Sequence, residues 1–600
     1  MGVVDSTWAA RENQVCASLA PLNCSRNVCC TGYALSGIRF IVQFSVNLSG
    51  HDCIRLDATA PQRPISRDVF LLRAGLLSFS IRRHRFSLLP LFVAVAAACR
   101  PADESGAPGD SVPAARQELT VGALEDEFGL ELNRPRLGMY PLNAGICEPL
   151  MKLGRGLQTE PWLATRSEYR GNNTYRLTLR RDVKFHDGSL FDARAAKYTL
   201  DHSVRVKTQY SYLSDQSVRV IDDSTIDVRP ALPNLRLAEQ LVHPSYGVIG
   251  PGSDPARRPV CTGPFRFVEY VPQSHITVAR NDFYWGDKTR LVRLTFRFFQ
   301  DDNTRALALR SGEVDAIFDV NRGMIAGLEA TPGVRIVKAS PGAVIVMYIA
   351  TRGAEPYSRM RDPAMRRAVA LAIDRKVLVE RVLEGHAAIV NTVNPPKVLG
   401  RYAARVTGIS YDPAESRRVL DSAGWKLGAG PVRTKGGKAL ELVMIMQPGH
   451  VDRFIGEYVQ AQLAAVGIKV TLDQLDPGAF SSRINSGAFD LDIEVPSQND
   501  ANPAFLLALR WYSKSNARGA RFMLAGPLFD SLVTASITSE SSDDAQRNAA
   551  EAMRVLVDEE VAAIPLAGVH RVYAMTDKVK GFDPHPSRTN QWWNTVWIAR

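Results

Sequence analysis

The sequence lacks the short motifs that mark the common catalytic and nucleotide-binding sites. It contains no GxSxG, HExxH, GxxxxGK[ST] or GxGxxG segment, so no nucleophile elbow, zinc-protease helix or phosphate-binding loop is indicated. The ten histidines are scattered and do not have the spacing of metal ligands. Active sites can be assembled from distant residues, so these absences count against an enzyme without excluding one. We predict no catalytic residues, no metal site and no cofactor.

A concentrated basic region is also missing, although the formal net charge is +11. The first 99 residues hold ten arginines, no lysine and five acidic residues, which leaves 63 basic and 57 acidic residues in the rest of the chain. A nucleic-acid-binding surface needs a basic stripe, preferably with interleaved aromatic residues. Neither feature is present, so we expect no nucleic-acid partner.

Cysteine is scarce outside the N-terminal region. Only Cys147 and Cys261 follow Cys99, whereas five of the eight cysteines lie in the first 53 residues. Two cysteines in a large body fit either an exported protein with one disulfide or a pair of buried thiols. The sequence leaves both possibilities open.

No apolar run of the length of a transmembrane helix, ~20 residues, occurs near the N-terminus. Instead, three arginines within residues 82–85 precede a thirteen-residue, mainly apolar run over 86–98, and small residues lead to Cys99. This order is typical of an export signal, and it resembles a bacterial lipobox, although Ala96 stands where leucine is usual. We predict a lipoprotein-type signal peptide over 81–99, lipidation of Cys99 and a flexible tether over 100–116. The alternative is a buried apolar segment.

Residues 1–80 precede this signal, although signal peptides act at the N-terminus. They show no sustained periodicity and hold the cluster of cysteines. We interpret them as a mis-assigned upstream segment, with translation starting near residues 69–81, or as disordered.

The body of the chain begins with strand signals. Residues 116–126 predict a first strand, and apolar residues alternate with polar ones over 175–180, as in a half-buried strand. Asp192 is placed to cap a helix that starts at residue 193. His186 lies in a His-Asp-Gly turn, where we expect a solvated side chain and not a ligand.

Three later segments carry helix signals. Residues 361–385 predict one amphipathic helix, with Asp362 as N-cap and Pro363 at the first helical position. Residues 411–425 repeat this arrangement, and residues 454–475 predict a helix, a glycine stop and a strand. Helix-then-strand units in succession predict an α/β architecture.

An ordered set of segments resembles the extracytoplasmic solute-binding proteins of ABC importers, family 5, whose members bind oligopeptides, dipeptides or nickel. The set extends from about residue 117 to residue 600, and no single segment decides the matter. In chain order the segments are EPLMK (148–152), PWLA (161–164), LRRDVKFHDGSLFDA (179–193), TGPFRF (262–267), RNDFYWG (280–286), TRALALRSGEVDAIFDV (304–320), MRRAVALAIDR (365–375), YDPAESRRVLDSAGW (411–425) and IPLAG (564–568).

The resemblance implies a two-lobed α/β fold of the periplasmic-binding-protein type II class (large, cluster C) with a hinge between the lobes. Lobe I would cover 117–345, with 566–600 returning to it, and lobe II would cover 346–565. A small peptide or peptide-like solute would bind between the lobes and shift the hinge equilibrium toward a closed form. That form would deliver it to membrane permease subunits powered by a separate ATPase. We expect an exported monomer, held by its lipid anchor in the periplasm or on the outer face of a bacterial membrane.

In this family the cleft contacts come mainly from two loops, which correspond here to residues 138–145 and 496–505. Peptide binders often carry an Asp-Pro step in the second loop, whose carboxylate pairs with the α-ammonium of the peptide. This chain has Asn502-Pro503 instead, with Asp500 two residues earlier. Asp500 either replaces the missing carboxylate or caps a helix that begins near Pro503. The candidate ligand-binding residues are Tyr140, Asn143, Gln498, Asp500 and Asn502, with Tyr212 and His243 chosen by approximate position.

Other interpretations remain open on the sequence alone. The same fold could serve as a solute sensor, or it could bind a metal chelate, a sugar or an opine. A hydrolase is a more distant alternative. Nickel specificity is disfavoured because residues 505–525 contain no histidine.

Overall fold

The computed structural model describes residues 28–35, 38–45, 113–124, 130, 144–206, 213–231 and 236–600, except residues 354, 448–452, 497, 516 and 518. The chain divides into two compact units, Met1–Glu104 and Ser105–Arg600. The predicted signal peptide with Cys99, and the tether as far as residue 112, lie outside the described residues.

The first unit contains an antiparallel hairpin of β1 (Val28–Leu35) and β2 (Ile38–Ser45). This hairpin lies within residues 1–80, which we interpreted as a mis-assigned upstream segment or as disordered. The sequence explains why a hairpin forms here. Two runs rich in β-branched and aromatic residues are separated by two residues, Ser-Gly, of the types that favour a hairpin turn.

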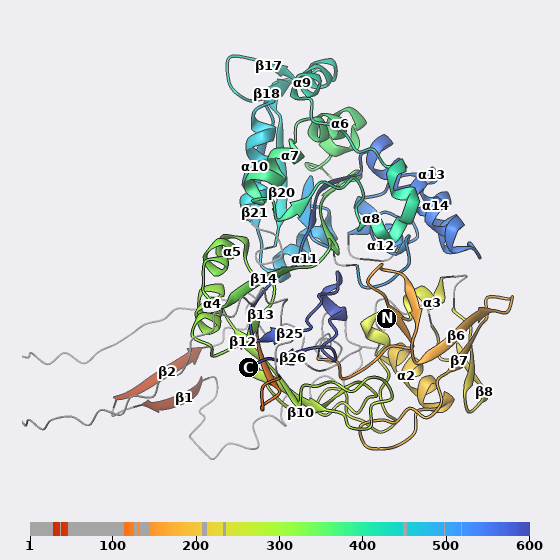
Figure 1. Ribbon diagram of the computed structural model, residues 1–600. Coiled ribbons are helices and arrows are strands. Elements are labelled where there is room, and N and C mark those ends of the chain that lie inside the picture. The colour runs from red at the N-terminus through yellow and green to blue at the C-terminus, as the bar shows by residue number, and fades with distance from the viewer. Residues whose placement is uncertain are drawn as a thin grey trace, which may run out of the picture. The chain divides into compact units, whose positions relative to one another are not determined.

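The second unit is built around two large mixed sheets (Figure 1). The sheet of lobe I has seven strands in the order β10-β11-β12-β3-β13-β24-β14, and β3 lies in its middle, parallel to both neighbours. The bounds in chain order are β3 (Glu118–Leu124), β10 (Phe265–Val271), β11 (His275–Arg280), β12 (Arg293–Phe299), β13 (Ala316–Ile317), β14 (Val334–Lys338) and β24 (Val572–Thr576).

The described residues of lobe I also form a four-stranded sheet, two small strand pairs and the helices α2 to α5. The four-stranded sheet has the order β6-β7-β9-β8. The bounds are β4 (Met151–Leu153), β5 (Thr159–Pro161), β6 (Ala164–Tyr169), β7 (Tyr175–Leu179), β8 (Val218–Asp222), β9 (Thr225–Val228), β25 (Val579–Lys580), β26 (Trp597–Ile598), α2 (Ala193–Arg205), α3 (Leu237–Gln240), α4 (Asp302–Arg310) and α5 (Arg322–Glu329).

The sheet of lobe II has six strands in the order β16-β23-β15-β22-β20-β21. In chain order these are β15 (Ala343–Ile349), β16 (Ala387–Ala388), β20 (Glu441–Met446), β21 (Lys469–Gln474), β22 (Leu491–Glu494) and β23 (Ala563–Val569). Successive residues of β15 face opposite sides, and every residue of the strand is buried. Its odd-numbered side chains from residue 345 join one core cluster and its even-numbered ones join the other. The strand therefore lacks the alternation of a half-exposed strand.

Helices cover both faces of this sheet. One core cluster contains residues of α6, α9 and α10, and the other contains residues of α11, α12, α13 and α14. The adjacent helices α13 and α14 pack along each other (Figure 1). The bounds are α6 (Pro363–Leu371), α7 (Arg375–Val377), α8 (Pro396–Leu399), α9 (Pro413–Ser422), α10 (Arg453–Ala464), α11 (Pro477–Ser486), α12 (Phe505–Arg510), α13 (Pro527–Ile537) and α14 (Ser542–Arg554). Among the helices of the described ranges, none has the length and apolar character needed to span a bilayer.

The chain passes between the two sheets twice, from β14 to β15 and from β23 to β24. The predicted lobe boundaries, after residues 345 and 565, fall inside β15 and β23. Both strands are apolar runs, so their ends are not marked by periodicity. At the first crossing a Cβ on Gly342 would lie 1.9 Å from Pro586 O, so this close approach of two backbones requires glycine.

Most predicted caps are present, but one predicted helix is divided. Asp192 accepts a hydrogen bond from Ala195 N at the start of α2, and Asp362 caps α6 with Pro363 as the first helical residue. The segment 361–385 is not one helix, because α6 ends at Leu371. Asp374 then caps the short α7 by accepting from Lys376 N and Val377 N. A side chain that can cap a new helix competes with continuation of the old one.

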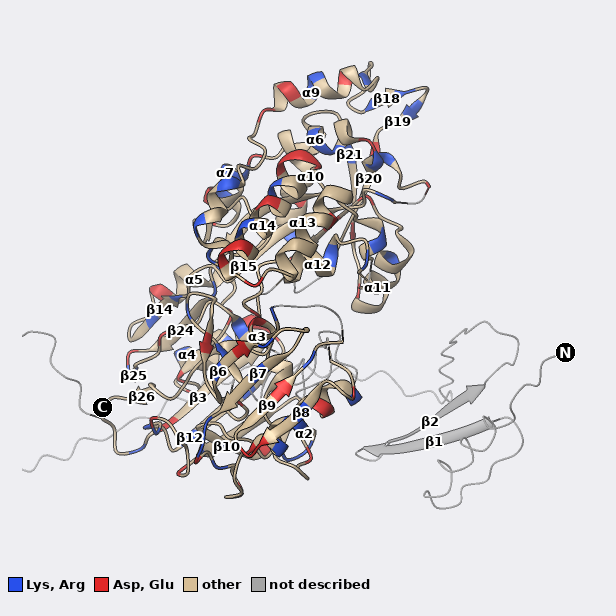
Figure 2. Cartoon of the chain, turned by 90° about the vertical axis from the view of Figure 1, so that its right-hand side faces the viewer, with Lys and Arg blue, Asp and Glu red and all other residues tan. Residues whose placement is uncertain are grey.

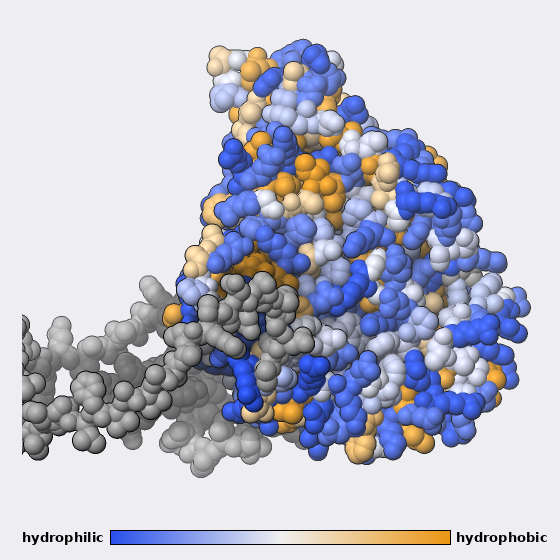
Figure 3. All heavy atoms as spheres, viewed as in Figure 1, coloured by the Kyte–Doolittle hydropathy of each residue, from blue (hydrophilic) through white to orange (hydrophobic). Residues whose placement is uncertain are grey.

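Charges and polar groups are spread over the surface of this unit. In Figure 2 the basic and acidic residues are interspersed along its elements, and neither sign collects in one stripe. Polar residues predominate on the face drawn in Figure 3, where apolar residues lie in separate groups. The mixture of signs in Figure 2 agrees with the near-balance of charge beyond residue 99.

Candidate functional site

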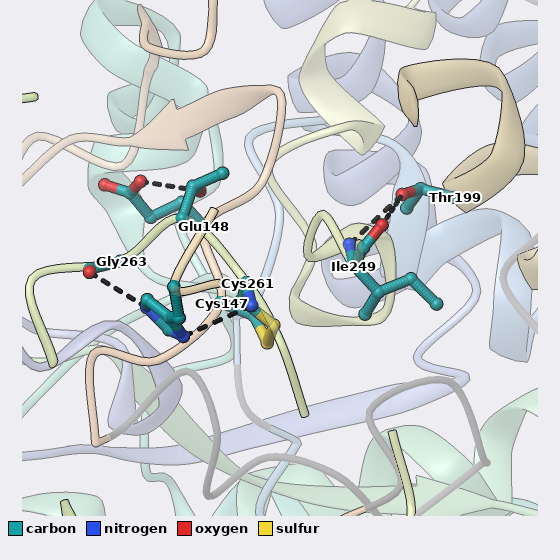
Figure 4. The surroundings of a disulfide bond; sticks show 8 residues. Cys147, Glu148, Thr199, Ile249, Cys261 and Gly263 are labelled. Carbon is teal, nitrogen blue, oxygen red and sulfur yellow. Dashed lines mark hydrogen bonds between the residues drawn. A yellow bond between two sulfur atoms is a disulfide. The ribbon is translucent and has the colours of Figure 1, made fainter. Parts of the chain in front are cut away.

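A disulfide joins the two cysteines of the body. Cys147 and Cys261 are bonded, with their Cα atoms 4.9 Å apart (Figure 4). His186 packs beside this bond: its Nδ1 accepts from Cys261 N at 3.2 Å, and its Nε2 donates to Gly263 O at 3.1 Å. Burial lowers the pKa of His186 to about 4, so the ring is neutral. The expectation of a solvated His186 is wrong because the turn folds back onto the disulfide-bonded segment.

Glu148 is a fully buried carboxylate near this disulfide (Figure 4). Oε1 accepts from Trp162 Nε1 at 2.9 Å and from the Tyr284 hydroxyl at 2.8 Å. Oε2 accepts from the Thr262 hydroxyl at 2.9 Å and from Trp285 Nε1 at 3.0 Å. Burial raises the pKa of Glu148, and the four donors oppose that rise. All four partners come from segments that carry the family resemblance, and Glu148 ties these segments into one scaffold.

The loop after β22 holds three of the predicted ligand-binding residues, and all three are almost fully buried. Asp500 Oδ1 accepts from Asn502 N at 2.9 Å and from Gln498 Nε2 at 3.3 Å. Asn502 Oδ1 accepts from Ala504 N at 3.0 Å. Helix α12 begins at Phe505 and has Ala504 at its N-cap position, so the alternative that Asp500 caps this helix is wrong. Asp500 and Asn502 instead hold the loop by local turns.

The second carboxylate oxygen of Asp500 is buried and has no hydrogen-bond partner among the described residues. Burial raises the pKa of Asp500 well above its ordinary value. The hydrogen bond from Asn502 N opposes this rise, and the like charge of Glu239 adds to it. The structure therefore presents an acidic group with an open acceptor at this loop.

Lobe I approaches the same loop through α3. Ala501 N donates to Glu239 O at 3.1 Å. Arg236 Nη1 donates to Glu239 Oε1 at 2.9 Å and to the Ser542 hydroxyl of lobe II at 2.8 Å, while Nη2 donates to Glu540 O at 2.9 Å. Burial raises the pKa of Glu239 to about 7, against the effects of Arg236 and Ser542. The two lobes are thus in direct contact here through charged and polar groups.

A second contact between the lobes uses a residue that the sequence analysis missed. Asn499 Oδ1 accepts from the hydroxyls of Ser587 at 3.2 Å and Thr589 at 3.1 Å. Asn499 lies in the predicted loop, but its partners come from the C-terminal segment after β24. The polar residues over 585–591 were the available signal.

The remaining predicted residues are placed as follows. Nδ1 of His243 accepts from Ser245 N at 3.2 Å and thereby caps a short turn, and burial lowers the pKa of this histidine to about 3. Tyr140, Asn143 and Tyr212 lie outside the described residues.

A hollow on lobe II contains none of the predicted residues. It is lined by Ile389, Val390, Asn391, Thr392, Pro396, Ala403, Ala404, Val406 and Thr407. The described ranges contain no group of three or more His, Cys, Asp or Glu that could hold a metal ion.

Comparisons with known proteins agree with this architecture. The nickel-binding periplasmic protein of Escherichia coli K12 is 27% identical over 430 residues, which cover 67% of this chain and 80% of that protein. The glutathione-binding protein GsiB of Salmonella choleraesuis is 29% identical over 323 residues, which cover 52% of this chain and 60% of that protein. The crystal structure of NikA from Brucella suis in complex with Fe(III)-EDTA matches with a TM-score of 0.71 at 23% identity, covering 80% of this chain and 99% of that one.

The family model described as "Bacterial extracellular solute-binding proteins, family 5 Middle" matches residues 158–518. The two-sheet fold, with its double crossing between lobes, is the fold of the structural neighbours. The chain belongs to the bacterial extracellular solute-binding proteins of family 5.

Proposed function

We propose that this protein is the substrate-binding component of an ABC importer and captures a small peptide or peptide-like solute between its lobes. The closed form would then deliver the solute to membrane permease subunits. Membership of the family supports the solute-binding part of this proposal. The glutathione-binding relative supports a peptide-like solute, while the nickel-binding relative makes a metal chelate the rival class.

Asp500 is the observation that carries the peptide proposal. Its Oδ2 is buried and unpartnered among the described residues, and the described loop brings no cation to it. A solute ammonium would supply both the charge and a hydrogen-bond donor, in the stronger class of charge-assisted bonds. The oxygen of Asn502 is already used by Ala504 N. Asp500, and not Asn502, therefore provides the carboxylate that peptide binders of the family present in this loop.

The export features complete the proposal. Cys99 would be lipidated after cleavage of residues 81–99, and residues 100–116 would tether the binding unit to the membrane. Three acyl chains on one cysteine would exceed the two anchoring signals that stable membrane attachment requires. The disulfide between Cys147 and Cys261 suits an oxidising compartment outside the cytoplasm.

The test is a thermal denaturation series on the protein from residue 100 onward. The probes are glutathione, a set of short peptides, nickel with histidine, and Fe(III)-EDTA. A solute at ~100 times its dissociation constant stabilises the folded state by ~2.7 kcal/mol. Stabilisation by peptides or glutathione alone is the expected result. Stabilisation by the chelates alone would contradict the peptide assignment and keep the solute-binding function.

A further inference from the structure

The contact between α3 of lobe I and the 498–503 loop of lobe II contains an excess of acceptors. Four buried side-chain oxygens there have no hydrogen-bond partner among the described residues. They are Glu239 Oε2, Gln240 Oε1, Asn394 Oδ1 and Asp500 Oδ2. The side chain of Glu239 is 14% exposed, and the other three residues are at most 4% exposed. While both carboxyl groups are ionised, all four oxygens only accept hydrogen bonds, so none can satisfy another.

Two hydrogen bonds place α3 and Asn394 against the 498–503 loop. Ala501 N donates to Glu239 O at 3.1 Å and joins the loop to α3. Asn394 Nδ2 donates to Pro503 O at 3.2 Å, which places the Asn394 carboxamide against the same loop. Burial is the main cause of the raised pKa of Asp500, and the like charge of Glu239 adds to it, so the two carboxyl groups lie within electrostatic range of each other.

The charges at this junction do not balance. Arg236 is the cation that pairs with Glu239, and it also donates to Ser542 Oγ and Glu540 O. Tyr175 of β7 also faces Arg236 and Glu239; burial raises its pKa to about 12, so it is neutral. Asp500 adds one carboxylate without a counter-ion among the described residues. With both carboxyl groups ionised, closure of the lobes would bury one negative charge without a counter-ion among the described residues, which is strongly unfavourable.

We propose that Glu239 is a specificity-determining residue of the solute site and that it holds, together with Asp500, an ammonium group of the solute across the junction of the two lobes. This inference rests on the proposed function and adds a lobe I carboxylate to it. A primary ammonium has three N–H donors. Two would satisfy Asp500 Oδ2 and Glu239 Oε2, and the third would satisfy one of the neighbouring amide oxygens. The cation also restores neutrality, so the lobes close preferentially on a solute that carries an amine.

The test compares free-amine and N-acetylated peptides by isothermal titration calorimetry at pH 7.5. The probes are an equimolar mixture of di-, tri- and tetra-alanine and the same mixture acetylated at the N-terminus. The wild-type protein should bind the free-amine mixture at least 10-fold more tightly. Glu239→Gln should weaken that binding at least 10-fold and change binding of the acetylated mixture little, because Arg236 is then balanced by Asp500. Ser542→Ala is the matched control: it removes a hydrogen bond between the lobes without a change of charge, so both mixtures should lose affinity equally.

Other results would overturn the inference, and they separate it from the proposed function. If Glu239→Gln lost affinity equally for both mixtures, Glu239 would be only a structural partner of Arg236 and would not recognise the amine. Equal binding of both mixtures by the wild type would show that the site does not require an amine. The inference would then be wrong, whereas the proposed peptide-binding function would stand. Binding of neither mixture would contradict the peptide function as well. Glu239→Asp keeps the charge and the pairing group for Arg236, so it provides a second test if Glu239→Gln does not fold. It should retain the preference for the free amine.

Discussion

Replacement of Asp500 by asparagine should make the solute-free protein more stable at pH 8. Asparagine has almost the same shape and keeps an oxygen that can accept from Asn502 N, as Asp500 does at 2.9 Å. Its amide nitrogen takes the place of the unpartnered Oδ2 and offers donors to the acceptor-rich junction. The substitution also removes a like charge from the neighbourhood of Glu239.

The expected gain follows from the cost of burying a carboxylate without a counter-ion. That cost is of the order of several kcal/mol, and the two hydrogen bonds to Asp500 Oδ1 offset part of it. We expect Asp500→Asn to raise the free energy of unfolding by about 1–3 kcal/mol at pH 8. The same change should weaken binding of an amine-bearing solute about 10- to 150-fold, since a hydrogen bond to a charged group contributes about 1.5–3 kcal/mol.

The sign of the pH dependence distinguishes this account from a general packing effect. The pKa of Asp500 is raised by burial, so the folded wild type binds this proton more tightly than the unfolded chain. Its stability therefore falls as the pH rises from about 4 through the raised pKa and is constant above it. The asparagine variant lacks this titration, so the gain should be present at pH 8 and disappear near pH 4.

Urea denaturation of both proteins between pH 4 and pH 8 measures this difference. Asp223→Asn is the matched control, because the Asp223 side chain is 87% exposed; its effect should stay within about 0.5 kcal/mol. A variant less stable than the wild type at pH 8, or a gain that persists at pH 4, would refute the reasoning.

Three further predictions concern the disulfide, the hydrogen bonds of Glu148 and the Asn499 contact between the lobes. The disulfide closes a loop with a sequence separation of 114, so Cys147→Ser with Cys261→Ser should lower the unfolding free energy by about 2–5 kcal/mol; an unchanged urea midpoint would argue against the bond. Glu148→Ala leaves four donors without their acceptor, two of them on the buried Thr262 and Tyr284, and should cost about 3–5 kcal/mol in the same assay, whereas a loss below about 1 kcal/mol would contradict the scaffold role. Asn499→Ala removes the acceptor of two hydroxyls across the lobes and should weaken solute binding about 2- to 10-fold in calorimetry; unchanged affinity would show that this contact does not stabilise the closed form.

Local signals in the sequence predicted much of the fold. The caps Asp192 and Asp362 act within three residues of themselves, so their effect can be inferred without the rest of the chain. The division at Asp374 was missed because a long apolar periodicity hid a second cap inside it. Pairing of Cys147 with Cys261 could not be chosen from the sequence, since it depends on how distant segments meet.

The candidate site was predicted only in part, because it also depends on contacts between distant segments. The family resemblance predicted the loop that holds Asp500, and the structure buries that side chain there. The contribution of Glu239 was not predicted, because α3 has four residues and no distinctive pattern. Its relation to Asp500 arises only when α3 meets the 498–503 loop through Ala501. Long-range contacts of this kind are not encoded in local periodicity.

Native mass spectrometry of the wild-type protein and Asp500→Asn, both purified without denaturation from residue 100 onward, tests the central claim most directly. The account predicts that the wild type carries a bound mass of a few hundred daltons with a reactive amine, which is released on unfolding, and that the variant carries much less of it. A wild-type protein without bound solute, or equal occupancy in both proteins, would contradict solute capture through Asp500.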